Sequence, residues 1–302
     1  MDSIKLSDVA DALNLSVTTV SRAISGKGRV AESTVEKVRA YISEHSYIPN
    51  RNAQALVFRR TFSIGILVPM DALVSEVWFF HKALMGAVRT ASSMGYDTIV
   101  SVHDEGDSLK KLIASKKADG YIFLRAVEDD PNVSMLSERN IPFAVIGNCR
   151  DKNALCVDCR NEEHASELTE RLVGMGAGKL LLLLGDMSYT VNTERRRGVE
   201  KVAENVSVVT GVQTAEDVDR ALENAGDYDA VIAGDDLLCL KVDSSSNRRN
   251  VKLLSSLYPS PLIKGMDGVV AAEGNDPSLL GSESAGLLIE NLNNREKISG
   301  EK

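Results

Sequence analysis

The sequence predicts a small all-α helix-turn-helix headpiece followed by an α/β body of two Rossmann-like subdomains. Three observations lead to this fold class. The 302 residues are too many for one small core and suit two or three domains. Residues 6–45 carry apolar positions at helical spacing. From Phe62 onward, apolar strand-like runs alternate with helical segments, as in parallel sheets covered by helices.

Two short helical runs occupy residues 4–29. Their apolar positions are Leu6, Val9, Ala10 and Leu13 in the first run and Val17, Val20 and Ile24 in the second. The break at residues 14–16 suits a tight turn, and the Ser16 hydroxyl can cap the second helix. The spacing predicts a helix-turn-helix, although it also fits two solvent-exposed helices of any α-helical domain. The exposed side of the second helix would carry small side chains and one arginine, which can reach phosphates and base edges: Val17, Thr18, Thr19, Ser21 and Arg22.

A third helix is expected from about Ser33 to His45. Its apolar stripe would close the small core under the first two helices, and Pro49 ends the helical path. Residues 50–60 follow as a marginally amphipathic segment that is too short to form a stable helix alone in water. By itself this segment could be a plain linker.

The body begins with a buried-strand run at residues 63–69. The helices expected after it span 76–94, 107–116, 134–139, 162–175, 194–204 and 215–224, and the strands span 96–102, 120–124, 142–146, 179–184, 206–209 and 230–233. Two consecutive series of this kind imply two subdomains with a cleft between their strand ends. The glycines at 174–178 fall at a helix end, so they indicate a helix C-cap and turn rather than a phosphate loop.

Charge is divided unevenly along the chain. Residues 1–60 contain nine Lys and Arg against six acidic residues, a net +3, and the whole chain carries −8, which leaves −11 for the rest. A basic head on an acidic body fits a protein whose head alone touches nucleic acid.

Several classes are excluded by what the sequence lacks. No apolar run approaches the roughly 18 residues of a membrane span. The N-terminus carries no signal peptide, so we expect a cytoplasmic protein with reduced cysteines. The Cys156-x-x-Cys159 spacing hints at metal or redox chemistry, but no second pair completes a site, and no cofactor or metal is expected. The four histidines show no nucleophile–His–acid pattern, so we expect no enzyme.

The string SDVADALNLSVTTVSRAISG, followed by YIPN at 47–50 and AQAL at 53–56, resembles the headpiece of LacI-type repressors. The resemblance is close over about the first sixty residues and looser to the C-terminus. It implies a transcriptional repressor, a homodimer on a palindromic double-stranded operator, and a periplasmic-binding-protein-like body for a small sugar-like effector. The implied domains are a headpiece at 1–49, a hinge helix at 50–60, and an effector-binding and dimerisation domain at 61–302, with subdomain one at about 61–149 plus 270–295 and subdomain two at about 150–269.

The same resemblance implies roles at DNA. In the family, paired hinge helices enter the minor groove, and a leucine, here Leu56, opens the central base step. Ala53 matches the small residue where the two helices approach, and Gln54 stands where many members carry Arg. The DNA-binding residues expected from the resemblance are Leu6, Ser16, Val17, Thr18, Thr19, Ser21, Arg22, Arg29, Asn50, Ala53, Gln54 and Leu56.

For the effector, the resemblance implies Asp71 after the first strand and an aromatic platform at Trp78 and Phe79. Arg195 matches the family's pocket arginine, which would clamp a hydroxyl or carboxylate, and Asp235 stands where the family usually has Asn. Two other interpretations stay open: Arg195 and Asp235 could pair without a ligand, and Trp78 could be a core or interface residue.

The C-terminal third departs from the family pattern. The helix expected to begin at Asp236 is interrupted by residues 243–250 after little more than two turns. The expected strand 251–254 is followed by Ser255 and Ser256, without the usual pocket acid. One pocket wall is therefore rebuilt or lost. The alternatives are a regulator controlled by a protein partner or by no ligand, and a cytosolic solute-binding protein. A last helix at 283–292, ending near Asn294 without heptads, predicts a dimer rather than a tetramer.

Overall fold

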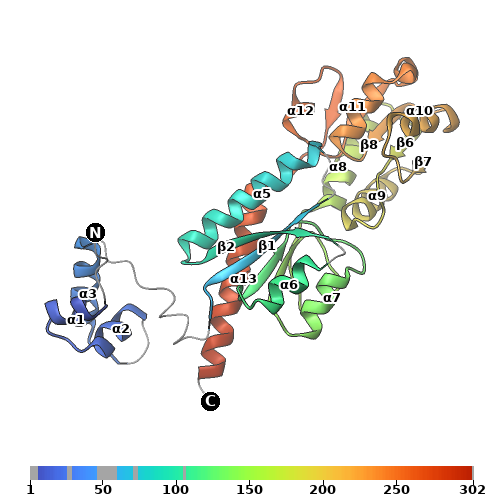
Figure 1. Cartoon of the computed structure of the whole chain (residues 1–302). Coiled ribbons are helices and arrows are strands. Elements are labelled where there is room, and N and C mark those ends of the chain that lie inside the picture. Colours follow the sequence, from blue (N-terminus) through green and yellow to red (C-terminus); the bar gives the residue numbers. More distant parts are fainter. Residues whose placement is uncertain (1–5, 26–28, 46–59, 71–73, 105–106, 301–302) are drawn as a thin grey trace. The chain divides into compact units, whose positions relative to one another are not determined.

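The computed structural model describes residues 6–25, 29–45, 60–70, 74–104 and 107–300 (Figure 1). The chain divides into two compact units, Met1–Phe62 and Ser63–Lys302. The expectations for Asn50, Ala53, Gln54, Leu56 and Asp71 concern residues outside the described ranges.

The first unit contains three helices among its described residues: α1 (Leu6–Ala12), α2 (Val17–Ser25) and α3 (Glu32–Glu44). They surround a small core in which five side chains are almost completely buried: Val9, Ala10, Val20, Ala23 and Val38. The turn between α1 and α2 passes through Asn14, whose φ of 51° is left-handed and is tolerated by Asn. This is the predicted helix-turn-helix.

The second unit begins with a five-stranded parallel sheet in the order β2-β1-β3-β4-β5. Its strands are β1 (Ser63–Pro69), β2 (Asp97–His103), β3 (Gly120–Phe123), β4 (Phe143–Ile146) and β5 (Leu155–Val157). Helices α6 (Ser108–Ala114) and α7 (Pro131–Glu138) cover one face, packing on alternate strand residues such as Leu67, Tyr121 and Phe123. Because the five strands are parallel, their carboxyl ends all lie along one edge of the sheet.

The other face of this sheet is covered by α5 (Val74–Ser93) and α13 (Pro277–Gly300), which lie side by side in Figure 1. The two helices approach at glycines. A Cβ added at Gly281 would overlap the backbone oxygen of Ala83, and one at Gly86 would overlap the backbone oxygen of Ser278. The C-terminal helix therefore belongs to the first sheet although it follows the second in sequence.

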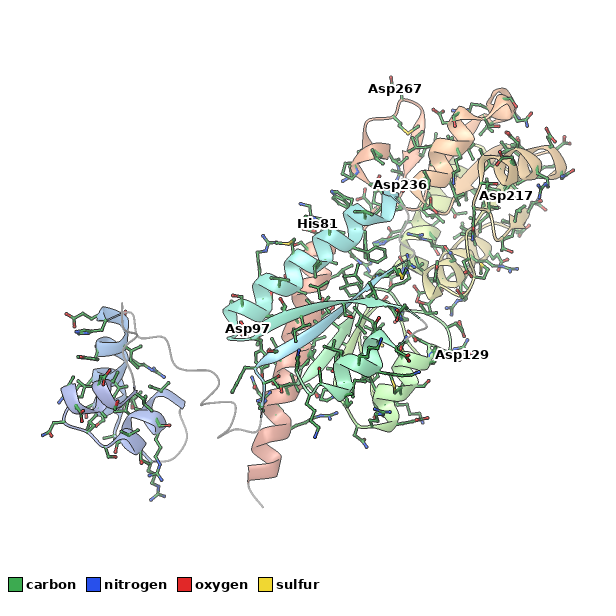
Figure 2. The ribbon with its side chains drawn as sticks, in the orientation of Figure 1. His81, Asp97, Asp129, Asp217, Asp236 and Asp267 are labelled. Atoms are coloured by element: carbon green, nitrogen blue, oxygen red, sulfur yellow. The ribbon has the colours of Figure 1, made fainter. Side chains whose placement is uncertain are left out.

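A second five-stranded parallel sheet has the order β10-β9-β8-β6-β7. Its strands are β6 (Leu180–Leu183), β7 (Val206–Val209), β8 (Ala230–Ala233), β9 (Leu253–Ser256) and β10 (Val269–Ala271). Helices α8 (Asn161–Gly174) and α9 (Thr190–Val202) cover one face, and α10 (Ala215–Asn224), α11 (Asp236–Ser244) and α12 (Pro261–Lys264) cover the other. A reciprocal capping box between Thr214 and Asp217 starts α10. Asp217 is labelled in Figure 2.

The predicted fold class is confirmed, with local corrections. The sequence did not predict β5, β10, α12 or the 3-10 turn Ser246–Asn250, because each is too short to show a period. The first sheet reaches Val157, which lies in the range expected for subdomain two. The last helix is longer than the expected 283–292, and β9 lies two residues later than expected. The glycines at 174–178 do form a helix end and turn, with Gly176 at φ +95°.

Candidate functional site

The headpiece presents the N-terminal half of α2 to solvent. Val17 is 47% exposed, Thr18 and Arg22 are exposed, and Thr19 and Ser21 are half-buried. The Ser16 hydroxyl caps the helix by accepting from the Thr19 backbone N at 3.0 Å, and the two hydroxyls lie 2.8 Å apart. Apart from these, Arg29 is exposed, whereas Leu6 packs against the small core. The N-terminal end of α2 therefore presents small side chains and Arg22 to solvent.

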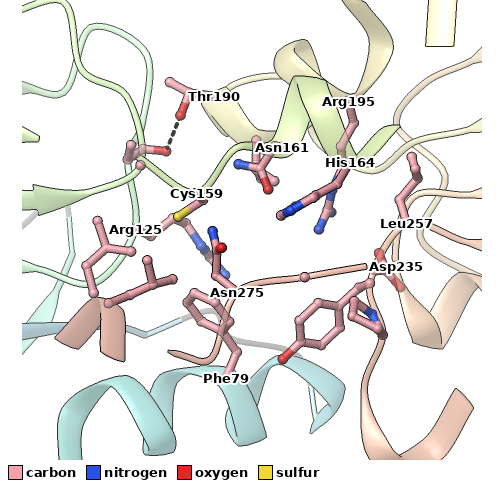
Figure 3. A pocket seen from close by; sticks show the side chains of 18 of the residues that line it. Phe79, Arg125, Cys159, Asn161, His164, Thr190, Arg195, Asp235, Leu257 and Asn275 are labelled. Carbon is pink, nitrogen blue, oxygen red and sulfur yellow. Dashed lines mark hydrogen bonds between the residues drawn. The ribbon is translucent and has the colours of Figure 1, made fainter. Parts of the chain in front are cut away.

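A cavity of about 890 Å³, counted with the space at its open mouth, lies between the two sheets of the second unit (Figure 3). Its walls come from α5, from the segments after β3, β4, β5, β8, β9 and β10, and from the first turns of α8 and α9. Parallel sheets expose such crevices at the carboxyl ends of their strands. Phe79, Arg195 and Asp235, expected at the effector, all line it.

The aromatic side of the cavity is built across the cleft. The Phe79 ring meets the Tyr258 ring at 6.1 Å between centroids, with an interplanar angle of 68°. Trp78 is 36% exposed, its ring lies 6.4 Å from that of Tyr258, and the Lys82 ammonium lies 6.0 Å from its centroid. Trp78 is not among the residues that line the cavity, whose aromatic surface comes from Phe79, Phe80 and Tyr258.

Asp235 and Arg195 lie on the polar side of the cavity. Asp235 caps α11 by accepting from the Leu238 backbone N at 2.8 Å. Burial raises the pKa of the Asp235 carboxyl. The hydrogen bond from the Leu238 N and the nearby positive charge of Arg195 partly oppose this rise. With Val191, the two residues also line a second hollow over the carboxyl ends of β6, β7 and β8.

Several polar residues of the cavity were not predicted from the sequence. Asn161, at the start of α8, donates to Glu194 Oε2 at 2.8 Å. Burial lowers the pKa of the His164 imidazole and raises that of the Cys159 thiol to about 12. The remaining polar or charged residues of this kind are Arg125, Thr190, Tyr258, Glu273 and Asn275. Many of them follow the ends of strands, which is a position that can be read from the sequence. The residues after β5 and β10 were missed because these two strands were not predicted.

One lip of the cleft is joined by backbone hydrogen bonds. The Glu128 N donates to the Ser188 oxygen at 2.8 Å, the Thr190 N donates to the Ala126 oxygen at 3.3 Å, and Val127 forms an antiparallel bridge with Tyr189. These bonds join the segment after β3 to the segment before α9. The two subdomains are therefore in direct contact beside the cavity.

The wall after β9 lacks an acid, as the sequence indicated. Ser256 Oγ donates instead to the Tyr258 carbonyl at 3.0 Å, and Ser255 Oγ donates to the Val231 carbonyl at 3.0 Å. A carboxylate is nevertheless present on the cavity wall, because Glu273 enters it from the segment after β10.

Two further properties bear on the kind of site. Within the described ranges, no group of three or more His, Cys, Asp or Glu side chains is placed to hold a metal ion. No helix in the described part of the chain is long and apolar enough to cross a membrane.

A helix-turn-helix unit joined to a two-sheet body with a cleft cavity defines a class of DNA-binding regulators with a periplasmic-binding-protein-like domain. Two family models match the chain: bacterial regulatory proteins of the lacI family over residues 5–50, and periplasmic binding proteins and sugar binding domain of LacI family over residues 61–226. The chain belongs to the LacI family and is a DNA-binding transcriptional regulator.

Individual relatives agree with this assignment. The HTH-type transcriptional regulator MalR of Streptococcus pneumoniae is 29% identical over 252 residues, covering 78% of this chain and 77% of MalR. DegA of Bacillus subtilis is 27% identical, covering 90% of this chain and 84% of DegA. These relatives are transcriptional regulators rather than enzymes.

Solved structures share the fold. A complex of the transcriptional regulator CelR with cellobiose has a TM-score of 0.66 and 24% identity, covering 97% of this chain and 94% of that one. A lac repressor dimer bound to operator and the anti-inducer ONPF has a TM-score of 0.69 and 20% identity, with the same coverage. At these identities the likeness concerns the fold.

Proposed function

We propose that the chain is a cytoplasmic repressor that binds a palindromic operator as a homodimer and whose operator affinity changes when a small sugar-like effector occupies the cavity. The domain assignment that goes with this proposal is a headpiece at 1–49, a hinge at 50–60 and an effector-binding and dimerisation body at 61–302.

The observation that carries the effector part is the meeting of Phe79, Arg195 and Asp235 on one cavity. These residues are far apart in sequence and come from α5, α9 and the start of α11. An aromatic face, a planar cation and a carboxyl with hydrogen-bonding capacity form a combination that suits a polyhydroxylated ligand. A CelR structure contains cellobiose, and another similar structure is that of a probable maltose operon transcriptional repressor. These two sugars are therefore suitable first probes.

At DNA, we assign Val17, Thr18 and Arg22 to base edges, where Val17 methyls favour a thymine methyl and Arg22 a guanine. Support for this comes from the exposure of all three on α2. Phosphate contacts are proposed for Ser16, Thr19, Ser21 and Asn50, with Leu6 and Arg29 flanking, and minor-groove contacts for Ala53, Gln54 and Leu56.

Two experiments test the proposal. In the first, the thermal midpoint of the full chain is measured with glucose, maltose and cellobiose, for wild type and Arg195→Ala. A sugar that raises the wild-type midpoint, and raises that of Arg195→Ala much less, supports the effector site. Bound sugar must then change the operator affinity by the same factor by which bound operator changes the sugar affinity, because coupling is reciprocal.

The absence of an acid after β9 favours a second candidate, a regulator that needs no small ligand. No midpoint shift with any sugar, together with tight operator binding, would favour this candidate over the first.

In the second experiment, operator affinity is measured at two salt concentrations for wild type and Leu56→Ala. Salt-dependent binding that Leu56→Ala weakens is expected for the head and hinge. Failure of wild type to select any duplex from a randomised pool would refute the DNA-contact assignments.

A further inference from the structure

The connection between β4 and β5 carries two thiols that lie against each other. The Cys156 thiol donates to the Cys149 carbonyl oxygen at 3.7 Å, and the two side chains are hydrogen-bonded to one another. Parallel pairing places Cys156 opposite Val145, and the Gly147 N donates to the Val157 oxygen at 2.9 Å. The chain doubles back between these points, so the cysteines at its two ends meet.

Asp151 holds the intervening segment in one conformation. Its Oδ1 accepts from the Asn153 backbone N at 2.8 Å and from Ser137 Oγ at 3.0 Å. Its carbonyl accepts from the Ala154 N at 3.2 Å. The approach of the two thiols is therefore built into a fixed loop, anchored to α7 through Ser137.

The two thiols are chemically unequal. The hydrogen bond from Cys149 lowers the pKa of Cys156 to about 7, and the same bond raises the pKa of Cys149. Both side chains are half-buried, so small reagents can reach them. A thiolate is the attacking species in thiol oxidation, and a thiol with a pKa near the ambient pH attacks best.

The other two cysteines have different surroundings. Cys159 directs its thiol to the Val157 carbonyl at 3.9 Å, and burial raises its pKa to about 12. Cys239 is completely buried in the core of the second sheet, and its pKa is raised to about 12 as well. The pair in the structure is thus Cys149 with Cys156, not the Cys156-x-x-Cys159 pair that the spacing suggested.

We propose that Cys149 and Cys156 are a modification site that forms a reversible disulfide on reaction with a hydroperoxide. The Cys156 thiolate attacks one peroxide oxygen and becomes a sulfenic acid, releasing water or an alcohol. The Cys149 thiol then attacks this sulfur, and its proton leaves with the hydroxyl group as water. Two electrons pass from the two thiols to the peroxide, and one S–S bond forms.

This site is independent of the effector assignment, but it lies beside the cavity. Strand β5 ends at Val157 and leads directly to Cys159 and Asn161 on the cavity wall. A cross-link at Cys156 therefore constrains the strand that carries that wall.

The test uses the reduced full-length chain, treated with hydrogen peroxide, alkylated and digested with trypsin. Cleavage after Arg139, Arg150, Lys152 and Arg160 places Cys149 on peptide 140–150 and both Cys156 and Cys159 on peptide 153–160. We expect these two peptides to be linked, and free thiols to fall from the four of the sequence to two. An internal disulfide within 153–160, or four thiols surviving, would overturn the proposal.

Matched variants identify the partners. Cys159→Ser is expected to keep the linked peptides, whereas Cys149→Ser loses them and leaves a Cys156 sulfenic acid that dimedone traps. Loss of the link in a folded Cys159→Ser would show that Cys159 is the true partner. A measurement on the wild type guards against variants that do not fold: iodoacetamide should label Cys156 first, with a half-maximal rate near pH 7, and faster labelling of any other cysteine contradicts the assignment.

Discussion

The guanidinium of Arg125 lies over the ring of Tyr189, 4.2 Å from its centroid, and joins the segment after β3 to the segment before α9. Arg125 also lies 5.0 Å from the centroid of Phe80 on α5. It is only 7% exposed, and a cation held between aromatic faces away from water is attracted by their ring electrons. Arg125 therefore contributes to the contact between the two subdomains from beside the cavity.

Replacing the Tyr189 ring should weaken this contact. We expect Tyr189→Ala to lower the free energy of unfolding of the body by about 1–3 kcal/mol, through the lost cation–π contact and lost packing. Tyr189→Phe keeps the ring and should lose less stability than Tyr189→Ala, and urea denaturation measures both. Equal losses in the two variants would mean that the hydroxyl, rather than the ring, makes the contribution.

The crossing of α5 and α13 predicts opposite effects for two glycines on one helix. Gly281→Ala places a methyl group on the Ala83 carbonyl, so α13 must move, at a cost of about 1–3 kcal/mol or more. Gly286→Ala meets nothing within 4 Å, so it should gain up to about 1 kcal/mol from helix propensity. Thermal denaturation of the two variants gives the comparison. A Gly281→Ala variant as stable as Gly286→Ala would be incompatible with this helix packing.

Two substitutions of Ser16, which caps α2, can distinguish an effect on headpiece stability from an effect on DNA affinity. Ser16→Ala removes the acceptor for the Thr19 N and should destabilise the headpiece by about 0.5–2 kcal/mol. Ser16→Asp keeps an acceptor at the cap but adds a negative charge facing the proposed phosphate. Hydrogen exchange of α2 should thus speed up in Ser16→Ala only, while operator affinity falls in both. Unchanged operator affinity in Ser16→Asp would remove Ser16 from the phosphate contacts.

Asp235 predicts a pH-dependent difference in stability. Burial raises its pKa in the folded chain above the ordinary value of 3.8, so the folded state binds the proton more tightly than the unfolded state. The stability from this group is fully present below about pH 3.8 and is lost as pH rises through the folded pKa. Asp235→Asn retains an oxygen acceptor for the Leu238 N and does not titrate.

The stability of Asp235→Asn relative to wild type should therefore increase from acid toward neutral pH and then level off. Chemical denaturation of both proteins across this pH range measures the difference. A difference that stays constant with pH would show that burial does not raise the pKa of Asp235.

The sequence predicted some elements closely because their signals are local. Helix α10 has the predicted limits, since Thr214 and Asp217 form its capping box and its apolar face repeats regularly. Ser16 caps α2 as expected. In contrast, β5 and β10 have three residues each, too few to show a pattern, and they form only because β4 and β9 offer them a sheet edge.

The cavity was predictable in part for the same reason. Arg195 and Asp235 follow recognisable strands and match family positions, and the structure places both on the cavity. Tyr258 and Glu273 follow β9 and β10, whose ends were misplaced or unrecognised. The meeting of Cys149 with Cys156 depends on the pairing of β4 with β5, which no local pattern indicates. Contacts of this kind are set by tertiary pairing, and their partners become visible only in the folded chain.

The two lips of the cleft differ in how freely evolution can change them. The lip at Ala126–Glu128 and Ser188–Thr190 is joined by main-chain groups, so substitution of side chains leaves its donors and acceptors in place. At the other lip the Phe79 and Tyr258 rings meet, and a single codon change at either residue can widen, narrow or recharge it. Under the proposed function, new effector preferences can therefore arise at the aromatic lip, while the backbone lip preserves the register in which the subdomains meet.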